Sequence, residues 1–384
     1  MNIPRLLNLN KLLKDKSYFL FGPRQTGKSW LIDHTLSQYR VYNLLESETY
    51  LKLSYAPQRI REEITPEDRF IIIDEIQKLP ALLDEVHLII EKNSIHFLLT
   101  GSSARKLKRS GVNLLGGRAR MQHLHPLSYA ELKENFDLTR ALNHGLLPSL
   151  YFSSAPEQDL KAYIGMYLKE EIAAEGLARN IPAFSRFLEV AALCNAKLIN
   201  FTNISNDAQV ARTTIHEYFE ILKDTLLGYE VTAWKKSIKR KPVSTSKFYF
   251  FDTGVVRTLQ HRSEVQPGSP EFGELFETYL CHELHAYMDY RLTNGFINYW
   301  RSLSGAEVDF ILNDQIAIEV KTSATISNAD LKGLKALQEE KSDIKHYVMV
   351  CFEKTPRLVD NIHILPWKVF LEKLWSDYFI SEKE

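Results

Sequence analysis

The chain of 384 residues is longer than one ordinary hydrophobic core supports, so its length predicts two or three domains. Its composition, 45% hydrophobic and 25% charged, is typical of a soluble globular protein. Lys plus Arg and Asp plus Glu are equal at 48 each, so the net charge gives no hint of a nucleic-acid partner, although basic residues cluster in two segments, 105–120 and 235–241.

Three absences in the sequence narrow the class of protein further. The cysteines Cys194, Cys281 and Cys351 are far apart and lack ligand spacing, so neither a disulfide framework nor a zinc site is implied, and the pattern indicates buried thiols in a reducing compartment. Nowhere do 18 apolar residues run together, and the first residues do not have the pattern of a signal peptide. We therefore expect a cytoplasmic protein.

Residues 22–29 read Gly-Pro-Arg-Gln-Thr-Gly-Lys-Ser and fill every fixed position of the phosphate-binding pattern G-x-x-x-x-G-K-[ST]. The apolar run 18–21 before them predicts a buried strand, and the spacing of apolar residues over 28–38 predicts a helix. In that context Lys28 reaches the β- and γ-phosphates of ATP and the Ser29 hydroxyl ligates Mg²⁺. The alternative is a surface turn that needs two glycines. The expected nucleotide contacts are Gly22, Pro23, Arg24, Gln25, Thr26, Gly27, Lys28 and Ser29.

A second apolar run, 70–73, is followed directly by Asp74 and Glu75. Unbroken apolar strands are buried in parallel sheets, and active sites lie at the carboxyl ends of such strands. Asp74 would hold Mg²⁺ through water and Glu75 would deprotonate the attacking water. The alternative is that both acids simply open the next helix, where negative charge suits the helix dipole.

Strand and helix patterns alternate up to about residue 150 and predict a doubly wound α/β domain. The next strand after Asp74, residues 95–100, is followed by Gly101, Ser102 and Ser103. A hydroxyl at this strand end can sense the γ-phosphate, although a plain turn would have the same residues.

Four motifs together resemble bacterial and archaeal AAA-type ATPases fused to a C-terminal domain of unknown function. They are the phosphate loop, Ile-Asp-Glu-Ile-Gln-Lys-Leu-Pro (73–80), Leu-Thr-Gly-Ser-Ser (99–103), and Gly-Gly-Arg (116–118) with Pro-Leu-Ser (126–128). The resemblance implies that Ser102 is the phosphate sensor. It also implies that Arg118 is an arginine finger that reaches the nucleotide of a neighbouring subunit, so that activity needs a ring or a dimer. Arg105 and Arg120 compete for this role, and a basic loop or a nucleic-acid contact is the alternative for Arg118.

After a helical stretch without nameable chemistry, residues 198–251 resemble a winged helix-turn-helix. A short helix over 205–210, a turn, and a second helix from 215 precede a strand (228–234), a basic hairpin (235–241) and another strand (247–251). Such modules also serve as packing modules, and Glu217 and Glu220 would repel a DNA backbone. The expected DNA contacts are Arg212, Thr213, His216, Lys235, Lys236, Lys239, Arg240 and Lys241.

The last segment begins after the break at 267–270 and resembles the core of PD-(D/E)XK nucleases. Asp309 lies on one strand, and Glu319-Val320-Lys321 lies on the next; a helix from 272 carries Glu277. Asp309 and Glu319 could hold Mg²⁺, Lys321 could activate water, and Glu277 could complete the metal site. The alternatives are a hairpin with an exposed Glu–Lys ion pair and a decayed nuclease that only binds.

The sequence thus predicts an α/β protein that uses ATP and Mg²⁺, binds DNA and assembles with further copies of itself. The main hypothesis is an ATPase that remodels or moves along DNA; the alternatives are a nucleotide-gated DNA nuclease and a nucleotide-switched regulatory module, like those of toxin–antitoxin systems, that binds protein. The expected domains are an ATPase core (1–130), a helical lid or linker (131–195), a winged helix-turn-helix (196–265) and a nuclease-like domain (266–384).

Overall fold

The computed structural model describes residues 3–93, 95–105, 107, 115–168, 180–291 and 295–379. The chain divides into two compact units. The first comprises residues 1–127, 147–149 and 220–227, and the second comprises residues 128–146, 150–219 and 228–384. The finer partition of the second unit into lid, helix-turn-helix and last domain stays a prediction.

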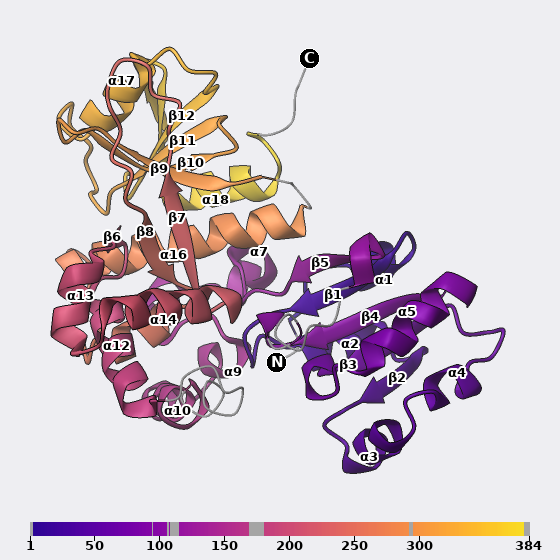
Figure 1. Ribbon diagram of the computed structural model, residues 1–384. Coiled ribbons are helices and arrows are strands. Elements are labelled where there is room, and N and C mark those ends of the chain that lie inside the picture. Colours follow the sequence, from indigo (N-terminus) through magenta and orange to yellow (C-terminus); the bar gives the residue numbers. More distant parts are fainter. Residues whose placement is uncertain are drawn as a thin grey trace. The chain divides into compact units, whose positions relative to one another are not determined.

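The first unit is built on a parallel sheet, whose strands lie in the indigo and purple part of Figure 1. Among its described residues the strand order is β2-β3-β4-β1-β5, and all four pairings are parallel. The strands are β1 (Ser17–Phe21), β2 (Arg40–Asn43), β3 (Phe70–Asp74), β4 (His96–Gly101) and β5 (Ala119–His123), and the helices are α1 (Leu9–Leu13), α2 (Lys28–Thr35), α3 (Ser47–Tyr55), α4 (Arg59–Glu63) and α5 (Leu82–Asn93).

Both faces of this sheet are apolar, as the continuous hydrophobic strands predict. Phe19, Ile71 and Leu99 alternate with Leu20 and Ile72 along the strands, so they point to opposite faces, and all are at most 1% exposed. The first set packs in one core with residues of α3, α4 and α5. The strand order changes direction at β1. From β1 the chain crosses to the edge strand β2, then adds β3 and β4 back toward β1, and finally places β5 on the other side of β1. The prediction of an α/β fold with a parallel sheet is confirmed.

After residue 127 the chain forms a helical region and then a mixed sheet. The helices are α7 (Tyr129–Leu132), α8 (Leu138–His144), α9 (Pro148–Tyr151), α10 (Pro156–Ala162), α12 (Ile181–Leu193), α13 (Phe201–Ala208), α14 (Arg212–Asp224), α15 (Thr253–Leu259), α16 (Pro270–Tyr290), α17 (Lys332–Gln338) and α18 (Trp367–Trp375). The strands are β6 (Lys197–Leu198), β7 (Gly228–Ala233), β8 (Lys247–Phe250), β9 (Ile297–Arg301), β10 (Glu307–Leu312), β11 (Ile316–Val320), β12 (His346–Cys351), β13 (Arg357–Val359) and β14 (Ile362–Pro366).

One sheet connects the expected helix-turn-helix segment with the last segment. Within the described part of the second unit its order is β13-β14-β12-β11-β10-β9-β7-β8-β6. Strand β7 pairs with β9 in parallel through Thr232 and Ala233, so the sheet crosses the boundary expected at residues 265 and 266. The first helix of the expected pair begins earlier than the sequence indicated, at Phe201, because Asn200 accepts hydrogen bonds from the N–H groups of Thr202 and Asn203 and caps it.

The longest described helix, α16, is mostly buried and supports this sheet. Ser269 caps its N-terminus and Pro270 occupies its first position, which is the usual signature of a helix start. The expected buried thiols are found at Cys281 on this helix and at Cys351 on β12, whereas Cys194 is half-buried. No helix within the described ranges is both long and apolar enough to cross a membrane.

Glu283 of α16 is a fully buried carboxyl group that accepts hydrogen bonds from the Tyr129 N–H at 2.7 Å and the Trp375 indole N–H at 2.8 Å. Burial raises the pKa of Glu283 to about 7, against the lowering effect of these donors. The folded protein therefore keeps this proton to a higher pH than the unfolded chain does. The contribution of Glu283 to stability is full below the ordinary glutamate pKa and is lost as the pH rises to about 7.

We predict that Glu283→Gln removes this dependence of the free energy of unfolding on pH. Between pH 5 and 8, the free energy of unfolding of the wild type should fall relative to that of Glu283→Gln by roughly 3 kcal/mol, which corresponds to the size of the shift in pKa. Urea unfolding at several pH values measures it. Glu217→Gln, an exposed glutamate of α14, is the control and should follow the wild type. Parallel curves for the wild type and Glu283→Gln would contradict the prediction.

Candidate functional site

The loop between β1 and α2 carries the eight residues of the phosphate-binding pattern. A Cβ at Gly22 would lie 2.4 Å from the Leu124 carbonyl oxygen, and Gly27 has a left-handed backbone with φ 92°. Both positions therefore require glycine. The Lys28 ammonium is buried and donates hydrogen bonds to the carbonyl oxygens of Gly22 at 2.6 Å and Pro23 at 3.2 Å. The cation thus lies inside the loop, where a polyphosphate would bind.

Arg5 braces this loop from outside the motif. Its guanidinium donates to the carbonyl oxygens of Thr26 at 2.5 Å and His125 at 2.6 Å, which ties the loop to the segment after β5. Gln25 accepts a hydrogen bond from the Ser149 hydroxyl at 2.6 Å. The sequence analysis did not identify Arg5; the only signal was a charged residue between the apolar residues Ile3 and Leu6-Leu7.

A hydrogen-bonded group at the carboxyl ends of β3 and β4 faces the start of α2. The Ser29 hydroxyl donates to Asp74 Oδ2 at 2.9 Å, and the Thr100 hydroxyl donates to Asp74 Oδ1. Strands β3 and β4 are neighbours, as the sequence predicted. Hydroxyl and carboxylate oxygens are the ligands that Mg²⁺ prefers, so Ser29 and Asp74 fit a magnesium ion beside the loop. Thr100 was missed, although a polar residue at the end of a buried strand could have indicated it.

Glu75 has an unusual backbone and a half-buried side chain. It is left-handed with φ 63° and ψ 43°, which is strained for a residue other than glycine and is typical of functional positions. Burial raises the pKa of its carboxyl group, while the Lys28 ammonium acts in the opposite direction. Its Oε2 accepts a hydrogen bond from the Gln77 amide at 2.5 Å, and Gln77 Nε2 also lies 3.5 Å from the Ser102 hydroxyl. Gln77 thus connects the expected base with the expected sensor.

Two of the three candidate arginines lie on the side of the first sheet opposite the phosphate loop, and the third follows β4. Arg118 precedes β5, which pairs in parallel with β1 from Ser17 onward. It therefore lies at the edge opposite the phosphate loop, about 20 Å of strand away. There it donates to Glu91 at 2.8 Å. Arg120 lies near the same edge, 3.4 Å from the Tyr18 hydroxyl, whereas Arg105 follows β4 and forms an ion pair with Asp224. The structure does not bring Arg118 to the phosphate loop of its own chain.

In the second unit, the residues predicted for a nuclease-like site lie together. Glu277 comes from α16, Asp309 from β10 and Glu319 from β11, and all three carboxyl groups are largely buried. The pairing of β9 with β10 is irregular between Val308 and Ile311, so Asp309 sits at a bulge, a feature that re-aims side chains near active sites. Its Oδ2 accepts a hydrogen bond from the Val320 N–H at 2.9 Å.

The electrostatics of this cluster are those of carboxylates held close together. Burial and the neighbouring Asp309 raise the pKa of Glu277 to about 7, and the same two causes raise the pKa of Glu319 well above its usual range. Lys321 lies 2.6 Å from Glu319 Oε1, whereas Glu319 Oε2 is buried and has no hydrogen-bond partner among the residues that the structure describes. An orphaned carboxylate oxygen among further carboxylates fits a hard divalent cation, and Asp309, Glu319 and Glu277 would hold it.

Lys247 of β8 also enters the cluster, and the sequence analysis did not assign it. Its ammonium lies 3.2 Å from Glu277, 2.7 Å from Glu307 and 3.4 Å from Asp309. Burial opposes the charge, but attraction to these three carboxylates outweighs it and raises the pKa of Lys247. We expected Lys247 to begin a strand of the helix-turn-helix segment, and no spacing in the sequence connects it with residues 30 to 62 positions away.

The expected recognition helix is α14, and its first residues are accessible. Arg212, Thr213 and His216 are exposed, and the His216 ring stacks on Phe201 of α13 with centroids 3.6 Å apart. The basic segment 235–241 differs from the expected free wing. Lys236 pairs with Asp314 at 2.7 Å, Arg240 pairs with Glu339 and with Glu340 at 3.1 Å, and the N–H groups of Ile238 and Lys239 donate to Glu340. Acids far along the chain thus neutralise part of this charge, while Lys235, Lys239 and Lys241 remain exposed.

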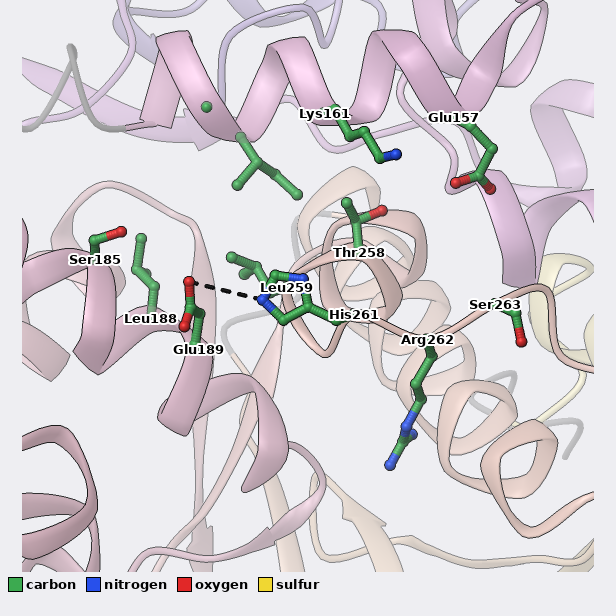
Figure 2. Close-up of a pocket in the computed structure, with 12 residues that line it drawn as sticks. Glu157, Lys161, Ser185, Leu188, Glu189, Thr258, Leu259, His261, Arg262 and Ser263 are labelled. Atoms are coloured by element: carbon green, nitrogen blue, oxygen red, sulfur yellow. Dashed lines mark ion pairs between the residues drawn. The ribbon is translucent and has the colours of Figure 1, made fainter.

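A cavity of about 550 Å³ lies among α10, α12 and α15 of the second unit, and Figure 2 shows its lining. His261 Nε2 lies 3.7 Å from Glu189 across it, and Lys161 and Arg262 add positive charge. Glu157, at its rim, is close enough to His144 and Glu264 for the three to share a cation, but it forms an ion pair with the buried Arg257. A metal would have to displace that guanidinium. None of the predicted site residues lines this cavity.

Three family models match successive parts of the chain. Residues 14–133 match an AAA domain, residues 135–266 match a domain of unknown function (DUF8612), and residues 272–370 match a second domain of unknown function (DUF4143). The first match covers the parallel sheet, the phosphate loop and the acids after β3. The chain therefore contains a P-loop ATPase domain of the AAA type. The chain also contains a C-terminal domain that matches the second domain of unknown function, DUF4143.

Relatives with curated sequences are distant. An uncharacterized protein of Mycobacterium tuberculosis is 24% identical over 322 residues, which is 80% of this chain and 70% of that protein. An uncharacterized protein of Haemophilus influenzae is 24% identical over 272 residues, covering 62% of this chain and 67% of that protein. The replication initiator DnaA bound to AMPPCP and single-stranded DNA is 14% identical, with a TM-score of 0.30 over 58% of this chain and 90% of that one.

Thr100→Val removes the hydroxyl that donates to Asp74 and keeps the side-chain shape. Because a hydrogen bond to a charged group contributes about 1.5–3 kcal/mol, we predict that ATP turnover falls by roughly one to two orders of magnitude while the fold is retained. Steady-state phosphate release and thermal unfolding measure the two effects. Thr35→Val is the matched control, since the Thr35 hydroxyl bonds only to the backbone of α2 in the contacts described. Unchanged turnover in Thr100→Val would show that Asp74 does not need this donor.

Proposed function

We propose that this protein is a Mg²⁺-dependent ATPase that acts on DNA. The observation that carries the ATPase part is the hydrogen-bonded group Ser29–Asp74–Thr100, which lies beside the buried Lys28 and next in sequence to Glu75. Mg²⁺ supplies charge neutralisation on the phosphates when it is bound. All other roles belong to residues of the chain itself.

The roles of the individual residues follow from their positions. The loop from Gly22 to Ser29 holds the phosphates with its N–H groups, and Lys28 exchanges its carbonyl partners for phosphate oxygens. Ser29 and Asp74 hold the magnesium ion. Glu75 takes a proton from the attacking water, and Ser102, 3.5 Å from Gln77, responds to the γ-phosphate.

Assembly into an oligomer is part of the proposal. Arg118 lies at the sheet edge opposite its own phosphate loop, so it can act as an arginine finger only on the nucleotide of another subunit. Its hydrogen bonds with Glu91 would then have to give way at the subunit interface. A homo-oligomer, as a ring or a dimer, satisfies this requirement.

The carboxylate cluster of the second unit supports DNA as the ligand. The order α16, β9, β10, β11, α17, β12 and the placement of Asp309, Glu319 and Lys321 are like those of PD-(D/E)XK nucleases. Glu277, Glu307, Asp309 and Glu319 face the ammonium groups of Lys247 and Lys321 and the Arg301 guanidinium, which leaves a net charge of −1 when all seven groups are ionised. One divalent cation brings this charge to +1, which suits the single negative charge of a phosphodiester.

A second contact with DNA is proposed for the helix-turn-helix segment. The sequence of elements α12, β6, α13, α14, β7 and β8 supports a winged arrangement, with the exposed Arg212, Thr213 and His216 at the start of α14. The exposed Lys235, Lys239 and Lys241 would meet phosphates. Lys236 and Arg240, which pair with carboxylates, contribute less than the sequence predicted.

Substitutions at the phosphate loop and at the proposed base separate binding from hydrolysis. Lys28→Ala should abolish ATP binding, because it removes the cation facing the phosphates. Glu75→Gln should keep binding and lose turnover by about 10²–10⁴-fold, the usual contribution of a general base. Fluorescent-nucleotide titration and phosphate release measure the two properties. Glu75→Gln hydrolysing ATP at the wild-type rate would assign the base to another residue.

Asp309→Ala tests the second site independently of the first. We predict that it abolishes any Mg²⁺- or Mn²⁺-dependent DNA cleavage and leaves ATP hydrolysis in the absence of DNA unchanged, because the two sites lie in separate units. Supercoiled, linear, single-stranded and branched DNA are incubated with each metal. Asp360→Ala, an exposed acid paired with Lys335, is the control and should cleave as the wild type does. If the wild type nicks none of these substrates with either metal, the nuclease activity is refuted.

A further inference from the structure

We infer that Lys247 is a built-in cation of the carboxylate cluster and limits it to one divalent metal ion. Its ammonium lies between Glu277, Glu307 and Asp309, at 2.7–3.4 Å from each. A metal ion on that side of the cluster would contact the same oxygens. The inference rests on the proposed metal site and specifies how many ions that site holds.

The surroundings of Lys247 fix its ammonium in this position. The side chain is 5% exposed, and the ammonium lies 5.6 Å from the centre of the Tyr299 ring, close enough for a cation–π contact. The Tyr249 hydroxyl donates to the same Glu277 oxygen that contacts Lys247, at 2.6 Å. A buried ammonium with three carboxylate neighbours is costly to move, because each carboxylate would lose the ammonium as a partner.

The opposite side of the cluster is where a single ion fits. Within the described ranges, Glu319 Oε2 is buried and lacks a hydrogen-bond partner, and Asp309 Oδ2 has one donor, the Val320 N–H, for its two lone pairs. These oxygens and the remaining capacity of Glu277 suffice for one hard cation completed by water. Lys321, which bonds to the other oxygen of Glu319, remains beside the ion.

The charge of the cluster leads to the same count. With Lys247 present, one divalent ion leaves a charge of +1, and a second would leave +3 in a largely buried site. Without Lys247, the carboxylates of Glu277, Glu307, Asp309 and Glu319 face only Lys321 and Arg301, and two divalent ions become acceptable. Lys247→Met should therefore convert a one-ion site into a two-ion site.

The test is the number of Mn²⁺ ions bound by the full chain without nucleotide, measured from the free Mn²⁺ signal in electron paramagnetic resonance. Glu319→Gln gives the baseline without the cluster. We expect the wild type to exceed this baseline by one ion and Lys247→Met to exceed it by two. Lys247→Arg keeps a cation and should exceed it by one. Lys335→Met, which removes an ammonium paired with Asp360 elsewhere in the same sheet domain, should also exceed it by one.

The outcomes separate the inference from the proposed function. A wild type that exceeds the baseline by two ions, or a Lys247→Met variant that exceeds it by one, overturns the role of Lys247 and leaves the metal site intact. A wild type equal to Glu319→Gln removes the metal site itself, and the inference with it. If Lys247→Met does not fold, crystals of the wild type with Mn²⁺ decide, since a single anomalous peak beside Glu319 supports the inference and a peak in place of the Lys247 ammonium refutes it.

Discussion

Parallel pairing of β1 with β4 and of β4 with β3 is the constraint on which the ATPase site depends. It places the ends of three strands at one sheet edge, so that a hydroxyl from α2, a carboxylate after β3 and a hydroxyl from β4 meet around Asp74. The crowding at this edge explains its glycines. A Cβ at Gly101 would lie 2.3 Å from the Gln77 side-chain oxygen, just as one at Gly22 would meet the Leu124 carbonyl.

Buried charge is balanced in two different ways in the two units. Asp74 is compensated by neutral hydroxyl donors, which an incoming cation can replace at little cost. The second cluster already contains an ammonium, so its carboxylates are partly neutralised before any metal binds. Glu340, fully buried, is compensated by Arg240 and by two backbone N–H groups. The first arrangement is suited to a site that exchanges its ligand, and the second to a site with a fixed charge.

The sequence predicted those parts of the site that are carried by neighbouring residues along the chain. The phosphate loop, Asp74 with Glu75, and Glu319 with Lys321 each form a local pattern, and the parallel sheet followed from continuous apolar strands. The sequence did not predict roles for Thr100, Arg5 and Lys247, because each acts through a partner from a distant element. The charge of segment 235–241 was overestimated for the same reason, since Asp314, Glu339 and Glu340 lie 78 to 102 residues further along the chain.

The pairing of β7 with β9 has a consequence for how this protein can be divided. A fragment that begins near residue 266 would contain Glu277, Asp309 and Glu319 but neither Lys247 nor the strand that covers the edge of β9. Its carboxylates would repel one another, and an unpaired strand edge is a template for aggregation. The match boundary between residues 266 and 272 marks a division in sequence families, and it cuts through one continuous sheet. The segments that match the two families therefore share one sheet in this chain, and each depends on the other for a complete sheet.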